Sequence, residues 1–191
     1  MSQPSQETGD TVQARVEALT AVAKKLNGDG NEVQALEAYK TASELMLGAP
    51  WLQHRTAELA RKLRQPEVAS LHYRRAAAAF IRAGFPKRAL APLRTARQMS
   101  ALLLPGDPSL FITTTLELAN VQRGLGCAAD ALHVLSNANQ ALRAAGCTER
   151  LPYDAEFARD SSRPPQSGVK SNVPGPIEGD LVARLEDAAK R

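Results

Sequence analysis

The sequence has few cysteines and few aromatic residues, and it lacks long apolar runs. Its 191 residues include only Cys127 and Cys147, too few for a disulfide framework and without the spacing of a zinc site. No apolar run approaches the roughly 18 residues that a transmembrane helix needs. The polar start, residues 1–10, lacks the charged-then-apolar pattern of a secretory signal. We therefore expect a cytoplasmic protein that does not insert into a membrane.

The shortage of aromatic residues also bears on the fold. Aromatic residues make up only 4% of the chain, whereas 33 of the 191 residues are alanine. Strands favour β-branched and aromatic side chains, and alanine is the best helix former. The composition therefore predicts an all-α protein with closely packed helices, long enough for one domain and a tail.

Apolar residues at helical spacing, separated by glycine and proline, predict about seven helices. Val12, Val16 and Leu19 recur at intervals of three and four residues, as on one face of a helix. Gly84 is placed to end a helix and Pro86 to begin the next, because a proline in the first turn loses no helical hydrogen bond. The expected helices span about residues 11–27, 32–47, 50–64, 66–83, 86–103, 109–124 and 128–145.

The ends of the chain differ in composition from the middle. We expect a disordered N-terminus over residues 1–10, a helical-repeat domain over 11–146 and a flexible, proline-rich linker over 147–176. Residues 177–191 regain an amphipathic pattern that predicts a short C-terminal helix. Its apolar face carries Leu181, Val182 and Leu185. The sequence leaves three alternatives for this helix: it docks in the protein's own groove, it docks on a partner, which includes self-association, or it is a frayed end without a partner.

One pattern, Ala-x3-large-x2-Ala, recurs in four of the expected helices. The four copies are Ala35, Tyr39 and Ala42; Ala69, Tyr73 and Ala76; Ala89, Leu93 and Ala96; and Ala131, Leu135 and Ala138. Small residues at these spacings let neighbouring helices approach closely, while the large residue fills the groove between them. Another small residue precedes each leading alanine by 12 positions, at Ala23, Ala57, Ala77 and Ala119. The pattern predicts a repeating two-helix unit.

The repeat resembles that of the tetratricopeptide family, whose helix–turn–helix unit has 34 residues. The first two copies are 34 residues apart, and Tyr73-x2-Ala76-Ala77-x2-Phe80 is similar to the first half of the family's pattern. The later intervals of 20 and 42 residues make the array degenerate. Over about residues 11–145, the resemblance implies a solenoid of antiparallel helix pairs that binds proteins and has no chemistry of its own. An irregular all-α bundle is the alternative.

Positive charge is concentrated in the middle of the chain. Residues 51–100 carry 11 lysines and arginines but only Glu58 and Glu67, a net charge of +9, whereas the rest of the chain carries −5. This basic band favours an acidic partner segment, because arginine can bind a carboxylate through two parallel hydrogen bonds. The candidate contacts are Arg61, Lys62, Arg74, Arg75, Arg82, Lys87, Arg88, Arg94 and Arg97.

The sequence gives less support to an enzymatic function or to nucleic-acid binding. His54, His72 and His133 fall in separate expected helices without a second ligand at metal spacing, so we expect no metal, no cofactor and no catalytic residue. The sequence favours a protein-binding adaptor, scaffold or chaperone-like module. Nucleic-acid binding through the basic band is the alternative, but Tyr73 and Phe80 fall on packing positions and not where bases would stack.

Overall fold

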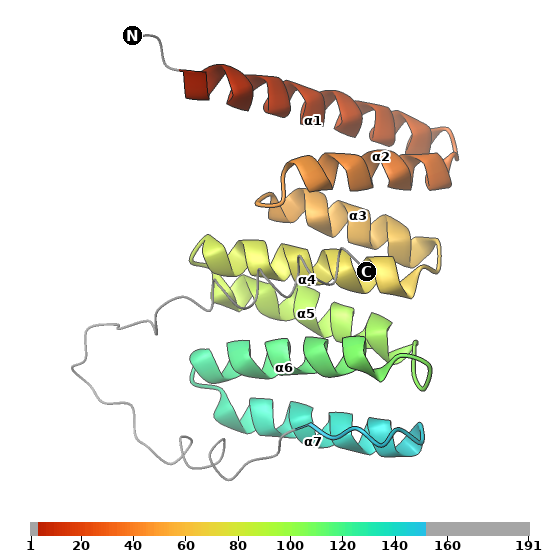
Figure 1. The fold of residues 1–191 in the computed structure, drawn as a ribbon, viewed down its shortest axis with the longest axis vertical. Coiled ribbons are helices and arrows are strands. Elements are labelled where there is room, and N and C mark those ends of the chain that lie inside the picture. The colour runs from red at the N-terminus through yellow and green to blue at the C-terminus, as the bar shows by residue number, and fades with distance from the viewer. Residues whose placement is uncertain (1–3, 152–191) are drawn as a thin grey trace, which may run out of the picture.

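The structure, a computed structural model, describes residues 4–151 and contains seven helices and no strand in that range (Figure 1). The helices are α1 (Pro4–Gly28), α2 (Glu32–Leu45), α3 (Pro50–Lys62), α4 (Pro66–Arg82), α5 (Pro86–Ala101), α6 (Pro108–Gly124) and α7 (Ala128–Ala144). The expected all-α fold is thereby confirmed. The expected helix over 177–191, with Leu181, Val182 and Leu185, lies outside the described residues, as does the linker beyond residue 151.

Proline marks the start of most helices, as the sequence predicts. The first residue of α3, α4, α5 and α6 is a proline, and the Asp107 side chain caps α6 by accepting a hydrogen bond from the Ser109 N–H at 3.0 Å. The first helix begins earlier than expected, at Pro4 instead of after Asp10. Residues 4–10 therefore belong to α1 and not to a disordered N-terminus, because Pro4 serves equally well as a first-turn residue.

One turn geometry ends five of these helices. The turn residue has a positive φ at Gly30, Arg64, Gly84, Gly126 and Gly146. The next N–H then donates to the carbonyl five residues before it, as from Asn31 to Leu26 at 2.8 Å and from Cys147 to Leu142 at 2.9 Å. This is the Schellman motif, which satisfies the last carbonyls of a helix while the chain reverses.

The same three positions are buried in each helix from α2 to α7. They lie 4, 8 and 11 residues after the N-cap. The four alanine copies occupy these positions in α2, α4, α5 and α7, and all of their residues are buried. They are Ala35, Tyr39 and Ala42 in α2, Ala69, Tyr73 and Ala76 in α4, Ala89, Leu93 and Ala96 in α5, and Ala131, Leu135 and Ala138 in α7. In α3 the positions hold Gln53, Ala57 and Ala60, and in α6 they hold Phe111, Thr115 and Leu118, all buried.

This shared register explains the irregular spacing of the alanine pattern. The interval of 20 residues joins the neighbouring helices α4 and α5, whereas the intervals of 34 and 42 residues pass over α3 and α6. The same buried register therefore recurs in both helices of each expected pair. The flanking Ala77 is also buried, and Phe80 is half-buried.

The residues of the pattern belong to different parts of the core. Ala42 of α2 lies in the apolar cluster at the N-terminal end of the stack, together with Leu36 and Leu52. Leu135 and Ala138 of α7 lie in the cluster at the C-terminal end, with Phe111 of α6. Each residue of the pattern packs in the interior, as expected.

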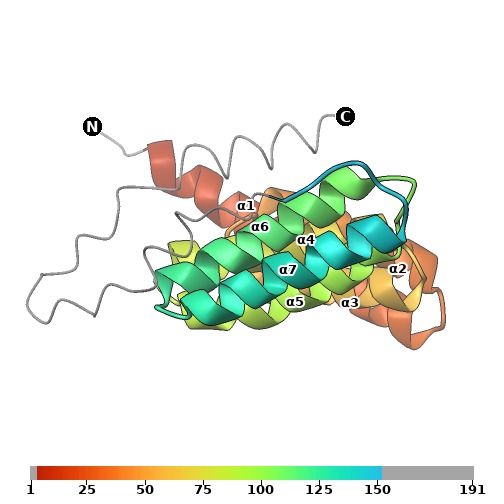
Figure 2. The same ribbon diagram turned by 90° about the horizontal axis from the view of Figure 1, so that it is seen from below.

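Each helix packs chiefly on the helices before and after it in the chain, so the fold is a ladder of antiparallel helices (Figure 1). Viewed along the stack, α4 and α6 lie in one layer and α3 and α5 in the other (Figure 2). Buried apolar clusters run from α1 through to α7. Such an arrangement buries the apolar face of each helix only against its neighbours, as in helical-repeat proteins.

The segment after α7 stays attached to the stack. Leu151 is 3% exposed, and its N–H and carbonyl are both hydrogen-bonded to the Asn139 side chain, at 2.8 and 3.3 Å. Cys147 is buried in the same apolar cluster. Residues 147–151 are therefore part of the packed domain, not of the linker expected to begin at residue 147.

Candidate functional site: a basic face on α3 and α5

The residues of the alanine pattern take no part in a binding surface. Ala42, Leu135 and Ala138 are fully buried, and the remaining members of the four copies are at most 7% exposed. A partner that binds the outside of the stack cannot reach them. Their role is to hold neighbouring helices together, and the candidate site must be sought among the exposed side chains.

The structure removes Arg74 from the surface that a partner could reach. Its side chain is 3% exposed and pairs with Glu117 of α6 through two hydrogen bonds, one of them from Nε to Oε2 at 2.8 Å. The pair ties α4 to α6 within one layer. The expectation that Arg74 contacts a partner is therefore wrong, because its charge is already neutralised inside the fold.

Arg75 and Arg97 are half-buried between helices. Burial lowers the pKa of the Arg75 guanidinium, and the nearby Glu44 carboxylate opposes that change. Burial also lowers the pKa of Arg97, whose guanidinium carbon lies 5.7 Å from the centre of the Phe111 ring. Both side chains are better placed to pack against neighbouring helices than to bind an outside carboxylate.

The other candidate residues are exposed, and most of them lie on α3 and α5. These two helices share a layer (Figure 2). On each of them the exposed residues lie on the helix side opposite the buried ones, so we place them on the outer face of that layer. We call the cations on it the α3–α5 basic face. They are Arg55, Arg61, Lys62, Lys87, Arg88 and Arg94. Arg82 is exposed too, but it lies at the end of α4.

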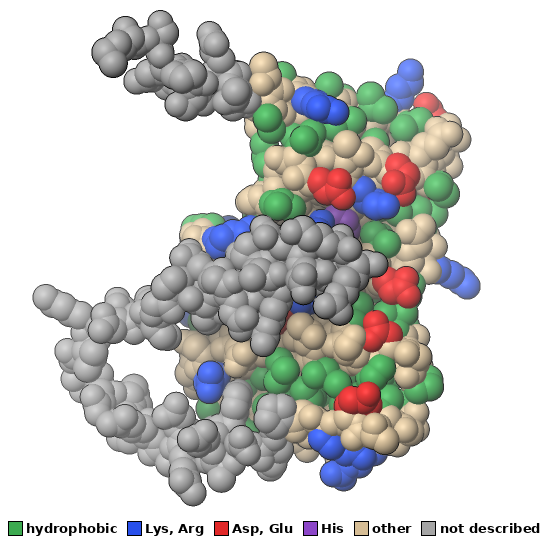
Figure 3. Space-filling view, in the orientation of Figure 1, with side chains coloured by type: hydrophobic (Ala, Val, Ile, Leu, Met, Phe, Trp, Pro, Cys, Tyr) green, Lys and Arg blue, Asp and Glu red, His purple; other side chains and the backbone are tan. Residues whose placement is uncertain are grey.

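The α3–α5 basic face has almost no negative charge. The only carboxylate on the two helices is Glu58, which is half-buried, and α5 has none. By contrast, acidic and basic side chains are interspersed on the side of the stack shown in Figure 3. A surface with such an excess of one charge sign attracts a ligand of the opposite sign.

Helical spacing arranges these cations in two rows. Arg55 and Lys62 are seven residues apart on α3, and so are Lys87 and Arg94 on α5. Seven residues are about two helical turns, or roughly 10 Å along the axis. The rows run in the same direction, because the chain reverses twice between α3 and α5. The face can therefore hold two carboxylates about two turns apart on one partner segment.

Two cations of the face already have carboxylate neighbours. Arg61 donates to Glu58 at 2.9 Å, and Lys62 pairs with Glu32 at the start of α2. Both cations are exposed, and such surface pairs contribute no more than about 1 kcal/mol. An incoming carboxylate can compete for either cation.

Glu58 accepts a hydrogen bond from the buried Tyr73 and so takes part in the packing of α3 against α4. Burial alone would raise its pKa, but hydrogen bonds from Tyr73 and Arg61 bring the pKa below its ordinary value. Burial, together with this carboxylate, raises the pKa of the Tyr73 hydroxyl above its ordinary value. Tyr73 is fully buried and crosses from α4 to α3, so Glu58 is fixed by an interhelical hydrogen bond and remains ionised.

Two aromatic side chains beside the face are exposed, which sequence patterns did not reveal. Trp51 of α3 and Phe85, the N-cap of α5, are 52% and 50% exposed. The Arg88 guanidinium carbon lies 4.9 Å from the centre of the Phe85 ring, a cation–π contact. Tryptophan and arginine are among the residues most enriched at the energetic centres of protein interfaces.

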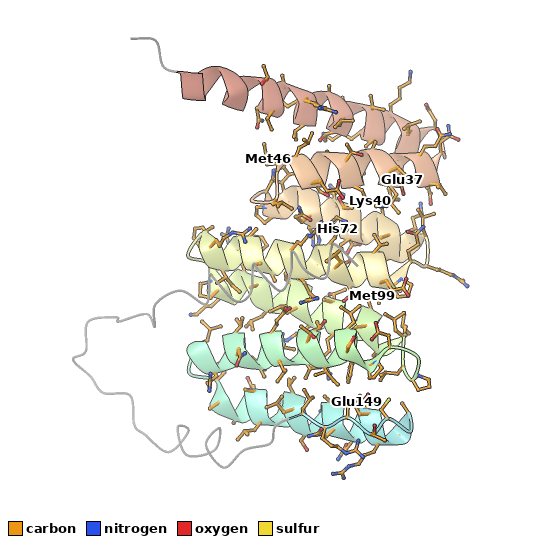
Figure 4. The ribbon with its side chains drawn as sticks, in the orientation of Figure 1. Glu37, Lys40, Met46, His72, Met99 and Glu149 are labelled. Atoms are coloured by element: carbon orange, nitrogen blue, oxygen red, sulfur yellow. The ribbon has the colours of Figure 1, made fainter. Side chains whose placement is uncertain are left out.

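The three histidines lie on three different helices, α3, α4 and α7. His72 is buried between α2, α3 and α4, and its Nδ1 lies 2.8 Å from Oε1 of Gln53 (Figure 4). Burial, and then the charges of Arg75 and Lys40, lower the pKa of His72 to about 3, so the ring is neutral. Among residues with described side chains, 11–151, no three His, Cys, Asp or Glu residues are grouped to hold a metal ion.

The comparisons with known proteins leave the surface itself as the guide to function. No protein-family model matches the sequence, and no curated protein is significantly similar to it. Within residues 4–151, no helix has both the length and the apolar character needed to cross a bilayer.

Proposed function

We propose that this chain is a non-catalytic, tetratricopeptide-like adaptor or scaffold of the cytoplasm that binds an acidic helical segment of a partner protein. The binding surface is the α3–α5 basic face. The observation that carries this proposal is the grouping of six exposed cations on two helices of one layer whose single carboxylate, Glu58, is half-buried. A chaperone-like role is the narrower form of the same proposal.

The geometry favours a helix over an irregular acidic tail. Carboxylates seven residues apart on a partner helix share one face and lie about 10 Å apart, which matches the spacing within each row of cations. The cations stand on helices held by buried contacts on both sides, so little backbone ordering opposes binding. Electrostatic complementarity of this kind also accelerates association.

Charge reversal tests the proposal. The full-length chain with Arg55→Glu, Lys87→Glu and Arg94→Glu is compared with a control carrying Arg15→Glu, Lys24→Glu and Lys25→Glu on α1. All six residues are exposed, and the two variants have the same net charge. The probe is a fluorescein-labelled helical peptide about four turns long, with glutamates two turns apart, measured by anisotropy at about 50 and 150 mM salt.

We expect the α3–α5 variant to bind at least about tenfold more weakly than the wild type and the α1 control to change less than about threefold. The same loss in both variants would show that only net charge matters. No binding by the wild-type chain at either salt concentration would refute the proposal.

Nucleic-acid binding is the second candidate, favoured by one observation. Trp51 and Phe85 are exposed beside cations, where bases could stack. Random single strands and duplexes of about 20 nucleotides are therefore tested in the same assay. Binding that is tighter than peptide binding, steeply weakened by salt and lost with Trp51→Ala and Phe85→Ala would replace the adaptor proposal.

A further inference from the structure

Three large apolar side chains are exposed at one edge of the ladder. We call Leu47, Trp51 and Phe85 the apolar edge. Their exposed fractions are 46%, 52% and 50%. Leu47 and Phe85 belong to the α2–α3 and α4–α5 connections, and Trp51 lies in the first turn of α3. The two connections lie along the same side of the stack, at the left of Figure 1. Grouped apolar side chains in contact with water indicate a surface that another segment covers.

Contacts within the fold hold this edge together. Nη2 of Arg82 donates to the carbonyl of Leu47 at 3.4 Å, which ties the end of α4 to the α2–α3 turn. Phe85 follows three residues later and lies under the Arg88 guanidinium. The apolar edge is therefore bordered by Arg82, Lys87 and Arg88, all exposed, and no described carboxylate pairs with them.

Residues 177–191 of the same chain have the complementary chemistry. At helical spacing, Ile177, Leu181 and Leu185 share one face, and Val182 lies beside them. Four carboxylates flank this apolar set. They are Glu178, Asp180, Glu186 and Asp187, and the segment also carries Arg184, Lys190 and Arg191, so its net side-chain charge is −1. The segment therefore offers apolar side chains to the apolar edge and carboxylates to the cations that border it.

The chain is long enough for the two to meet. Twenty-five residues, 152–176, connect Leu151 to residue 177. At about 3.3 Å per residue they can span up to roughly 80 Å. The route from the end of α7 to the apolar edge covers the length of one helix, about 25 Å, and two helix spacings of about 10 Å each. A tether of this length also gives the segment a high effective concentration at the edge.

We propose that residues 177–191 bind intramolecularly to the apolar edge. Leu181 and Leu185 cover Trp51 and Phe85, and the flanking carboxylates lie near Arg82 and Arg88. Because Lys87 and Arg88 also belong to the α3–α5 basic face, the bound segment obstructs one end of that face and weakens the binding of an outside acidic segment. This goes beyond the proposed function, since the contact within the chain needs no partner.

Trp51 reports on this contact directly, because it is the only tryptophan in the chain. The full-length chain with Leu181→Asp and Leu185→Asp is compared with a control carrying Val169→Asp and Val173→Asp. Both variants replace two apolar residues with aspartates, and only the first changes the proposed contact. Trp51 emission and acrylamide quenching are measured for each at low and at about hundredfold higher protein concentration, with thermal unfolding as a check on the fold.

We expect the Leu181→Asp/Leu185→Asp chain to emit at longer wavelength and to be quenched about twofold more strongly than the wild type and the control. Equal quenching in all three chains overturns the proposal. Wild-type quenching that falls as the protein concentration rises also overturns it, because the contact is then between chains. In the peptide assay above, the same variant should bind the probe about threefold more tightly. If no chain binds the probe but the Trp51 difference is present, the proposed function fails and the intramolecular contact stands.

Discussion

Polar side chains in the interior link one helix of the ladder to the next. Gln53 of α3 donates to the Ser43 carbonyl of α2 at 2.8 Å and lies at the same distance from His72 of α4. Ser70 of α4 donates to the Ala96 carbonyl of α5 at 3.1 Å. Each bond needs a defined register between helices, and a buried group that lost its partner would cost about 1–3 kcal/mol. These residues therefore favour one stacking of the helices over slipped alternatives.

His72 makes the stability of the fold sensitive to acid. Its pKa is about 3 in the folded chain and about 6.5 when unfolded, so the unfolded chain binds the proton more readily between these values. The free energy of unfolding should therefore decrease as pH falls from 6.5 towards 3, by up to about 1.4 kcal/mol per pH unit from this residue. Between about pH 7 and pH 5 the loss from His72 is about 2 kcal/mol.

Urea unfolding at about pH 7 and pH 5 measures this effect. His72→Gln removes the titrating ring but can still hydrogen-bond to Gln53, so its stability loss between the two pH values should be about 2 kcal/mol smaller than in the wild type. His133→Gln is the control, because it replaces a histidine outside the core in the same way. An equal loss in wild type and His72→Gln would show that the buried ring is not responsible.

At the scale of single helices, the shared register predicts which positions tolerate a larger side chain. Ala131 is buried 4 residues after the N-cap of α7, while Ala129 on the same helix is exposed. Ala131→Leu should lower the free energy of unfolding by about 1–3 kcal/mol, because the added side chain forces α6 and α7 apart. Ala129→Leu should change it by less than about 0.5 kcal/mol. Equal effects of the two substitutions in urea unfolding would contradict the register.

The helix boundaries were largely predictable because they depend on local chemistry. Proline in the first turn and glycine with positive φ act within a few residues of where they stand, so the expected and observed ends of α3 to α7 differ by no more than two residues. The register of α3 and α6 was not predictable from the alanine pattern. Gln53 and Phe111 occupy the position that alanine holds elsewhere, and only the packed helices show that they are equivalent.

The candidate site was predictable only in part. The charge excess of residues 51–100 pointed to α3 and α5, since these helices carry most of it. The burial of Arg74 was not visible, because its partner Glu117 is 43 residues away on another helix. The exposure of Trp51 and Phe85 could not be predicted either, because it also depends on contacts with helices that are distant in the sequence. Whether an aromatic residue is covered depends on which helices flank it, and that is a property of the stacked molecule.

At the scale of the whole molecule, the effect of a local destabilisation should decrease with distance along the stack of helices. Because each helix packs chiefly on its two neighbours, a local loss of packing should loosen the nearest helices first, as in other linear arrays. Val16 of α1 is 1% exposed and belongs to the apolar cluster at the N-terminal end, whereas Leu93 of α5 is 2% exposed in the middle of the stack. Truncating each to alanine tests whether the position in the ladder decides how far the disturbance reaches.

Hydrogen exchange followed by mass spectrometry resolves this helix by helix. Val16→Ala should accelerate exchange in α1 and α2 and leave α6 and α7 unchanged, because five helices separate α1 from α7. Leu93→Ala should accelerate exchange on both sides of α5, since opening the middle of the ladder removes the support of each half. Uniform acceleration over all seven described helices with Val16→Ala would instead identify one cooperative bundle, in which no surface could open or close independently of the rest. A graded response would mean that the α3–α5 basic face, supported from both sides, stays rigid when either end of the ladder frays.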